Sequence, residues 1–183
     1  MSVCPRNKPA IVRAGGIEAL SKNLGHESEN IKFHCVTAMR NLSDVPAQLV
    51  STLAITQPHR PHNPVSCFQT DPATFFNRLS ELLANPDPQI TICAAGVIMN
   101  VTNKAENKLA FCQAKGIQAL VEAVKRLSKH PQLVEPAVIG LRHVTNNHAK
   151  QDVAQSVLIN EVNGLPHLMT ALDHQMQVRF LLE

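Results

Sequence analysis

Three polar residues recur at related positions along the chain and could recognise a ligand together. Asn41 and Asn100 each end a similar apolar pattern, and His143 takes the equivalent place 43 residues after Asn100. An Asn side chain carries both a donor and an acceptor, and a His can still donate. A row of such groups could hold the main chain of an extended peptide. The alternative is that each Asn only helps to end its helix.

A second set of recurring residues is basic. Lys8 and Lys108 lie 100 residues apart and each follows an Asn, Arg40 directly precedes Asn41, and Arg142 belongs to the same set. A single Lys or Arg is usually a solvated surface charge, and one exposed ion pair contributes only about 0–1 kcal/mol. Several such charges along one groove could still steer an acidic ligand and fix its register. The pattern therefore predicts a groove suited to acidic peptides.

The sequence offers little that would support catalysis or cofactor binding. It has no Gly-rich phosphate loop, nucleophile elbow or HExxH motif. Its five cysteines form no CxxC pair, which favours reduced, buried thiols of an intracellular protein. His59 and His62 lie in a Pro-rich stretch that would give a metal ion no fixed geometry. We therefore expect a protein that is not an enzyme and needs no metal or cofactor.

The recurring residues belong to a repeated pattern of short helices. The segment 15–20 recurs at 115–120 and more loosely at 163–168, and the segment 35–43 recurs at 94–102 and 137–145. Each unit is predicted to contain three helices, and glycines at 15–16, 116 and 164 are predicted to end the first helix with a left-handed residue. The predicted first helices are 8–13, 104–114 and 152–161; the second helices are 17–24, 72–84, 117–128 and 165–172; the third helices are 31–42, 89–102 and 133–145.

The spacing of these units favours stacked helical repeats. The interval of 43 residues between Asn100 and His143 falls in the ~40–47 residue range of armadillo and HEAT repeats. Stacking such units buries a continuous core. We therefore expect an all-α, right-handed armadillo-repeat α-solenoid of about three to four repeats, forming part of a longer array. The expected repeats are 1–44, 45–103 and 104–147, followed by a partial repeat at 148–183 that stops within a third helix at 180–183.

The second expected repeat is longer than the others. Asn41 and Asn100 are 59 residues apart, and four prolines lie within residues 55–72. Because proline cannot continue a helix, we predict an insertion at about 55–72, preceded by a degenerate first helix at 45–55.

Composition excludes several classes of protein. The chain is 44% hydrophobic and only 3% aromatic, lacks Trp, and carries a net charge of +3. Proteins that bind nucleic acid are usually more basic, and no uninterrupted apolar run approaches the ~18 residues of a membrane span. We expect a soluble protein of the cytoplasm or nucleus that neither binds nucleic acid directly nor inserts into a membrane.

The motifs resemble those of the β-catenin family of armadillo-repeat proteins, in which plakoglobin-like relatives share most of them. The resemblance covers nearly the whole chain except residues 45–75 and is carried by segments 7–16, 40–44, 91–96, 100–102, 135–137 and 141–145. It implies that the third helices line a groove for extended acidic peptides. The implied partners are cadherin cytoplasmic tails, T-cell-factor/lymphoid-enhancer-type transcription factors, and adenomatous polyposis coli or axin-like proteins. It also implies a scaffold or transcription coactivator in cell adhesion, Wnt signalling or both, in the cytoplasm, nucleus and adherens junction.

The same resemblance assigns the groove residues. They are Lys8, Thr37, Arg40, Asn41, Asn100, Lys108 and His143. In the family, the residues matching Lys8, Arg40 and Lys108 contact acidic peptides, with the match of Lys108 as a main anchor. Thr37 stands where the family carries a groove Trp, and Asn147 where it carries a basic residue, so binding at those two subsites should be weaker.

An alternative function is a general armadillo adaptor, such as a nuclear-transport-type binder of basic peptides. That class needs acidic residues and Trp along its groove. This chain has no Trp and places Arg and Lys there.

Overall fold

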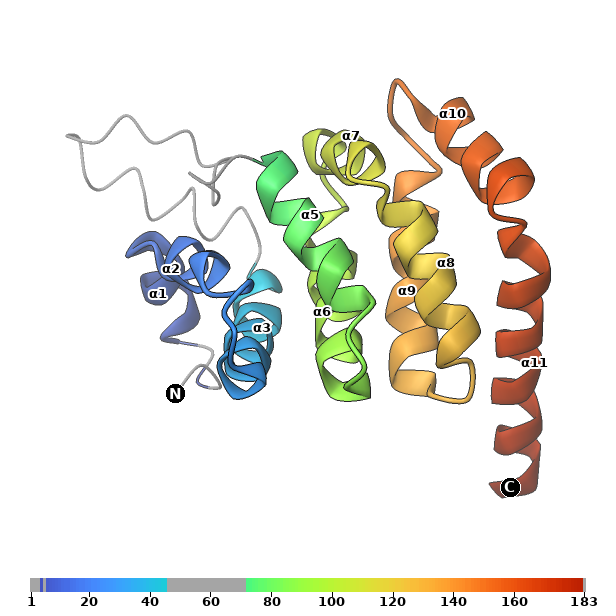
Figure 1. Cartoon of the computed structure of the whole chain (residues 1–183), viewed down its shortest axis with the longest axis horizontal. Helices are drawn as coiled ribbons and strands as arrows, with labels where there is room; N and C mark the ends of the chain where they lie inside the picture. The colour runs from blue at the N-terminus through green and yellow to red at the C-terminus, as the bar shows by residue number, and fades with distance from the viewer. Residues whose placement is uncertain (1–3, 5, 46–71, 183) are drawn as a thin grey trace.

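Short helices follow one another through the part of the chain that the structure describes (Figure 1). The computed structural model describes residues 4, 6–45 and 72–182. The predicted degenerate helix at 45–55 and insertion at 55–72 lie almost wholly outside the described residues, as do His59 and His62. The helices are α1 (Lys8–Arg13), α2 (Gly16–Lys22), α3 (Glu29–Ser43), α5 (Pro72–Leu83), α6 (Pro88–Val101), α7 (Ala105–Gln113), α8 (Gly116–Arg126), α9 (Pro131–Val144), α10 (Gln151–Ser156), the π-helical turn η1 (Val157–Glu161) and α11 (Gly164–Leu182).

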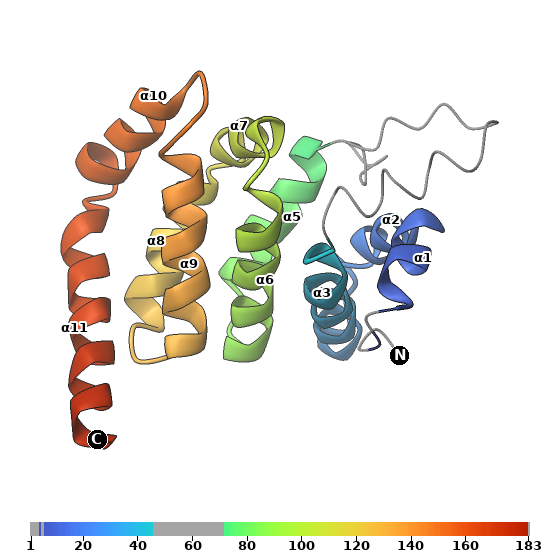
Figure 2. The ribbon, with the colours of Figure 1, turned by 180° about the vertical axis from the view of Figure 1, so that it is seen from behind.

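The helices stack in successive layers. The views in Figures 1 and 2 place α2, α5 and α8 on one side and α3, α6 and α9 on the other. The largest contacts join α3 to α6 and α6 to α9, and one cluster of buried apolar side chains runs through the stack. The predicted all-α solenoid is confirmed. No helix among the described residues is both long and apolar enough to cross a membrane.

Most predicted helix positions agree with the structure to within a few residues, because prolines and glycines punctuate the sequence. Pro88 and Pro131 each occupy the first position of a third helix, where the missing N–H costs nothing. One predicted end is wrong. The helix expected to stop at Leu172 continues to Leu182 as α11, since no Gly or Pro occurs between residues 167 and 182 to interrupt it. The separate third helix expected at 180–183 is therefore wrong as well, because residues 180–182 belong to α11. The division into repeats at 1–44, 45–103, 104–147 and 148–183 stays a prediction.

The glycines between first and second helices differ from the expectation. Gly15 is left-handed, with φ of 83°, but the equivalent left-handed residues are Lys115 and Asn163, with φ of 54° and 47°. The prediction that Gly116 and Gly164 supply this conformation is wrong.

These glycines are instead required by close packing. A Cβ on Gly16 would lie 2.5 Å from Ile11 Cγ2, one on Gly116 would collide with the Phe111 ring, and one on Gly164 would lie 2.5 Å from the Leu158 side chain. In the first two pairs the glycine lies five residues after its contact partner in the sequence, and in the third pair it lies six residues after it. The π-helical turn η1 explains the difference, because such a turn holds one more residue than an α-helical turn.

The last helix, α11, exposes an apolar face that is buried on α8. Met169 is 65% exposed and Leu165 is 45% exposed on α11. Their counterparts 48 residues earlier on α8, Val121 and Ile117, are each 1% exposed. The difference arises because α8 is covered by α5 and α11.

Candidate peptide-binding groove

The last turns of the third helices bring three predicted site residues to the same level of the solenoid. Asn41, Asn100 and His143 lie in the last turns of α3, α6 and α9. All three are half-buried. The helices that carry them pack directly against one another, α3 on α6 and α6 on α9.

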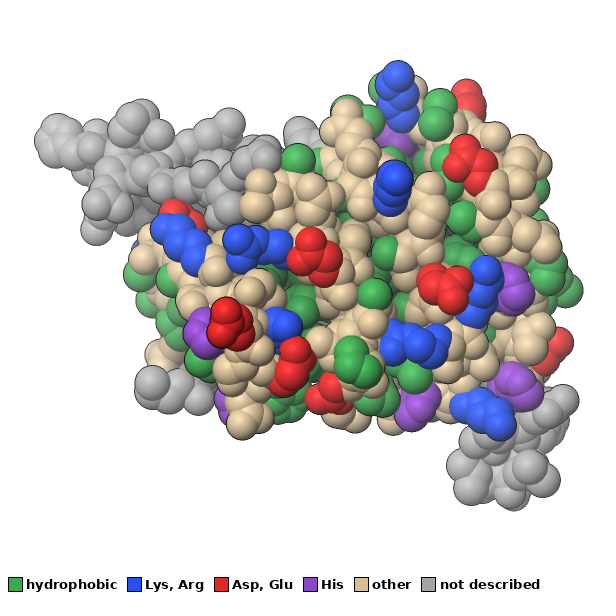
Figure 3. Space-filling view, in the orientation of Figure 1, with side chains coloured by type: hydrophobic (Ala, Val, Ile, Leu, Met, Phe, Trp, Pro, Cys, Tyr) green, Lys and Arg blue, Asp and Glu red, His purple; other side chains and the backbone are tan. Residues whose placement is uncertain are grey.

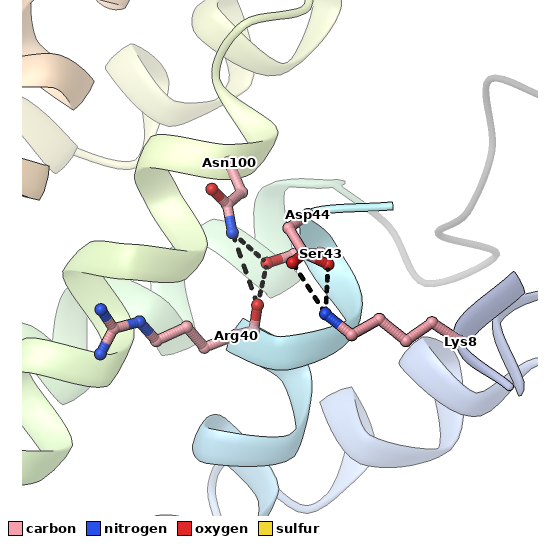
Figure 4. A network of polar contacts seen from close by, with 5 residues as sticks. All are labelled: Lys8, Arg40, Ser43, Asp44 and Asn100. Carbon is pink, nitrogen blue, oxygen red and sulfur yellow. Dashed lines mark hydrogen bonds and ion pairs between the residues drawn. The ribbon is translucent and has the colours of Figure 1, made fainter. Parts of the chain in front are cut away.

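Asn100 links α6 to α3. Its Nδ2 donates to Ser43 Oγ at 2.9 Å and approaches the main-chain oxygen of Arg40 at 3.4 Å (Figure 4). Ser43 Oγ in turn donates to the same Arg40 oxygen at 3.0 Å. The amide that was predicted to hold a peptide therefore already bridges two layers. Its carbonyl oxygen offers further hydrogen-bonding positions beyond these contacts.

His143 links α9 to α6 in the same way. Thr102 Oγ1 donates to the Ile98 main-chain oxygen at 2.7 Å, so His143 Nδ1 is the donor in its 3.3 Å contact with Thr102 Oγ1. His143 also makes a hydrogen bond with the main chain of Met99, which occupies on α6 the place that Arg40 occupies on α3. Burial, reinforced by the nearby Lys108 ammonium, lowers the pKa of His143. The contact recurs because a hydroxyl residue, Ser43 or Thr102, stands two positions after Asn41 or Asn100.

The two equivalent lysines tether first helices to the ends of third helices. Lys8 Nζ, from α1, forms an ion pair with Asp44 at 2.8–2.9 Å (Figure 4). Lys108 Nζ, from α7, donates to the main-chain oxygen of Asn146 at 2.7 Å and lies 3.5 Å from that of Asn147. Lys108 is only 6% exposed. Its expected role as a main peptide anchor stays a prediction, and its ammonium is already engaged within the chain.

Arg40 differs from the lysines because its charge has no such partner among the described residues. Its side chain lies across α6 over Gly96, where a Cβ would come within 2.5 Å of the Arg40 Nε. Figure 4 shows the guanidinium pointing away from Lys8 and Asp44. It makes no hydrogen bond or ion pair with another residue in the described ranges. Beside it, Thr37 Oγ1 lies 3.5 Å from Cys93 Sγ, linking α3 to α6 at the place expected for a Trp.

The opposite side of the solenoid has a different character. Over α2, α5 and α8, basic and acidic side chains are interspersed (Figure 3). Within residues 4, 6–45 and 72–182, no three His, Cys, Asp or Glu side chains are grouped as a metal site would require.

Sequence reasoning missed several residues that build this region. Asp44 and Thr102 were not assigned a role, and Gly96 was expected only to let neighbouring third helices stack closely. The hydroxyl residues could have been found, because Ser43, Thr102 and Thr145 each stand two positions after Asn41, Asn100 or His143. Each donates to a main-chain oxygen three or four residues earlier.

Comparison with known proteins places this architecture in a family. The model of the armadillo/β-catenin-like repeat matches residues 4–44. Catenin beta from Urechis caupo is 35% identical over 173 residues, which are 94% of this chain and 18% of that protein. Junction plakoglobin from Homo sapiens is 35% identical over 182 residues, which are 97% of this chain and 21% of that protein. The chain belongs to the β-catenin-like armadillo-repeat family.

A solved structure extends the likeness to three dimensions. It comes from work on a phosphorylation switch that controls the interaction between cadherin and β-catenin, and it matches this armadillo chain with a TM-score of 0.74 and 32% identity. The match covers 92% of this chain and 28% of the other. The chain spans about a fifth of the length of the curated relatives that it matches, from 16% to 21%. The predicted armadillo solenoid is confirmed.

Proposed function

We propose that this armadillo chain is a non-enzymatic scaffold that binds extended acidic peptides across α3, α6 and α9. The observation that carries the proposal is the Arg40 guanidinium, which lies across α6 without an ion-pair partner among the described residues. An Arg held in this way can donate two parallel hydrogen bonds to one carboxylate. Arg142, exposed at the equivalent end of α9, adds a second positive charge along the same surface.

The other site residues have graded roles in this proposal. Asn41, Asn100 and His143 supply hydrogen bonds to the peptide main chain, and Thr37 forms part of the surface beside Arg40. Lys8 can reach a ligand carboxylate if that group replaces the exposed carboxylate of Asp44. Lys108 would first have to leave the Asn146 oxygen, so we place the main electrostatic contact at Arg40.

The partners follow from the likeness to catenins and plakoglobin. The solved neighbour concerns cadherin and β-catenin, so a cadherin cytoplasmic tail is the first proposed ligand. T-cell-factor/lymphoid-enhancer-type transcription factors and adenomatous polyposis coli or axin-like proteins are proposed as further acidic ligands. The corresponding roles are cell adhesion and Wnt signalling, and the corresponding places are adherens junctions, cytoplasm and nucleus.

A charge reversal with a matched control tests the proposal. Arg40→Glu should weaken binding of a fluorescent cadherin-tail peptide at least tenfold, because it puts a negative charge where the ligand carboxylate would sit. Lys22→Glu makes the same change of charge on α2, on the opposite side of the solenoid, and should alter affinity less than twofold. Equal affinities for the two variants would refute the assigned surface.

A further inference from the structure

The helix α6 carries a glycine in its interior that its backbone conformation does not require. Among the described residues, Gly15 is the glycine with a positive φ, so Gly96 has an ordinary helical backbone. An interior glycine destabilises a helix relative to Ala. Gly96 is buried, so a reason for the missing side chain should lie in what packs against it.

The side chain of Arg40 occupies the space that a Cβ at Gly96 would take. That Cβ would lie 2.5 Å from Nε, 2.8 Å from Cδ and 3.1 Å from Cγ of Arg40. Three consecutive side-chain atoms therefore lie flat on the bare backbone of α6. The main chain of Arg40 is held as well, because Asn100 and Ser43 both donate to its oxygen.

This contact bears on ligand recognition. A free Arg side chain is among the most mobile and loses much rotamer entropy when a ligand fixes it. A side chain already laid along a helix loses less, and its planar guanidinium is presented in one orientation. The contact with Gly96 holds the stem of the side chain and leaves the guanidinium without an ion-pair partner among the described residues.

We propose that Gly96 is a positioning residue, whose bare backbone seats the Arg40 side chain across α6 and orients its guanidinium toward the carboxylates of an acidic peptide. The inference rests on the proposed function. It assigns to a residue that touches no ligand a share of the affinity for acidic ligands.

The variant Gly96→Ala tests the seat, and the chain supplies a matched control. An Ala at position 96 suits the helix and must displace the Arg40 side chain. Gly140→Ala adds the same methyl group to the interior of the neighbouring third helix, α9. There the new Cβ would meet Ile98 at 3.4 Å, Leu120 at 3.5 Å and Met99 at 4.0 Å, all ordinary contacts.

Three measurements on the full chain distinguish the seat from a structural role. Gly96→Ala should weaken cadherin-tail peptide binding about three- to tenfold without lowering the melting temperature, whereas Gly140→Ala should leave affinity unchanged. In an Arg40→Met background, Gly96→Ala should have no further effect on affinity, because the guanidinium whose orientation it would change is gone. The NMR signal of the Arg40 Nε–H group should shift in Gly96→Ala without peptide.

The outcomes separate the two proposals. If the wild type binds, Arg40→Met weakens binding and Gly96→Ala keeps wild-type affinity, then the positioning role of Gly96 is overturned. The proposed function stands in that case. Absence of wild-type binding overturns the proposed function and the part of the inference that rests on it. An unshifted Arg40 Nε–H signal overturns the seat whether or not the peptide binds.

Discussion

Replacing Lys108 by Met should destabilise the fold, although Lys108 was first predicted to be a ligand anchor. The change keeps the apolar stem of the side chain and removes the ammonium that donates to Asn146 O at 2.7 Å. A hydrogen bond from a charged group contributes about 1.5–3 kcal/mol, and the 3.5 Å contact with Asn147 O adds little because of its length. The Asn146 and Asn147 residues are exposed, so their oxygens can regain water. We therefore expect a loss of about 1–2 kcal/mol.

Lys8 provides the comparison, since it makes the equivalent tether on the surface. Its ion pair with Asp44 is exposed on the Asp44 side, and exposed pairs contribute about 0–1 kcal/mol. Urea denaturation followed by far-ultraviolet circular dichroism should show a larger loss for Lys108→Met than for Lys8→Met. The reasoning is refuted if Lys8→Met costs as much as Lys108→Met, or if Lys108→Met costs less than about 0.5 kcal/mol.

This prediction affects how binding experiments at Lys108 are interpreted. A variant such as Lys108→Glu could lose peptide affinity because its groove is distorted rather than because an anchor is missing. Binding should therefore be compared at temperatures where the variant and the wild type are equally folded.

Four further substitutions test the packing of the helices and the hydrogen bonds between layers. Wild-type stability should fall as pH drops below the ordinary His pKa of about 6.5, because the folded state lowers the pKa of His143 and so resists protonation. His143→Asn should remove that part of the loss in melting curves taken across this pH range. Gly116→Ala should cost about 1–3 kcal/mol in urea denaturation, because its Cβ would collide with Phe111. Val121→Ala should cost about 1–3 kcal/mol, whereas Met169→Ala on the exposed face should stay within about 0.5 kcal/mol.

Each of these has a contradicting result. If the melting temperatures of wild type and His143→Asn change identically with pH, protonation of His143 does not contribute to the pH dependence of stability. An unchanged free energy of unfolding in Gly116→Ala would mean that α7, which carries Phe111, can move away from α8. Equal losses for the two alanine substitutions on α8 and α11 would mean that α11 is covered like α8.

The sequence predicted the helices well because their boundaries are local. Pro88 and Pro131 start third helices, and the glycines near residues 15 and 116 separate first from second helices. Positions in the motif also placed Asn100 and His143 at equivalent helix ends. Repeat spacing and punctuation require no knowledge of tertiary contacts, so they can be read from the sequence.

The contacts that the site residues make within the chain could not be predicted in the same way. Lys108 looks like a solvated charge near the start of a helix, but its acceptor is the Asn146 main chain, 38 residues away. The role of Gly96 depends on where Arg40 lies on a neighbouring helix, 56 positions earlier. The six-residue spacing from Leu158 to Gly164 depends on a π-helical turn that no local motif marks.

Binding of two peptides of opposite charge tests the central claim most directly. An extended Asp- and Glu-rich peptide and a Lys- and Arg-rich peptide of the same length are titrated into the wild-type chain at low and raised salt. The acidic peptide should bind, with an affinity that falls as salt screens the charges of the groove, and the basic peptide should not. Tighter binding of the basic peptide, or acidic-peptide binding that is insensitive to salt, would contradict an acidic-peptide scaffold.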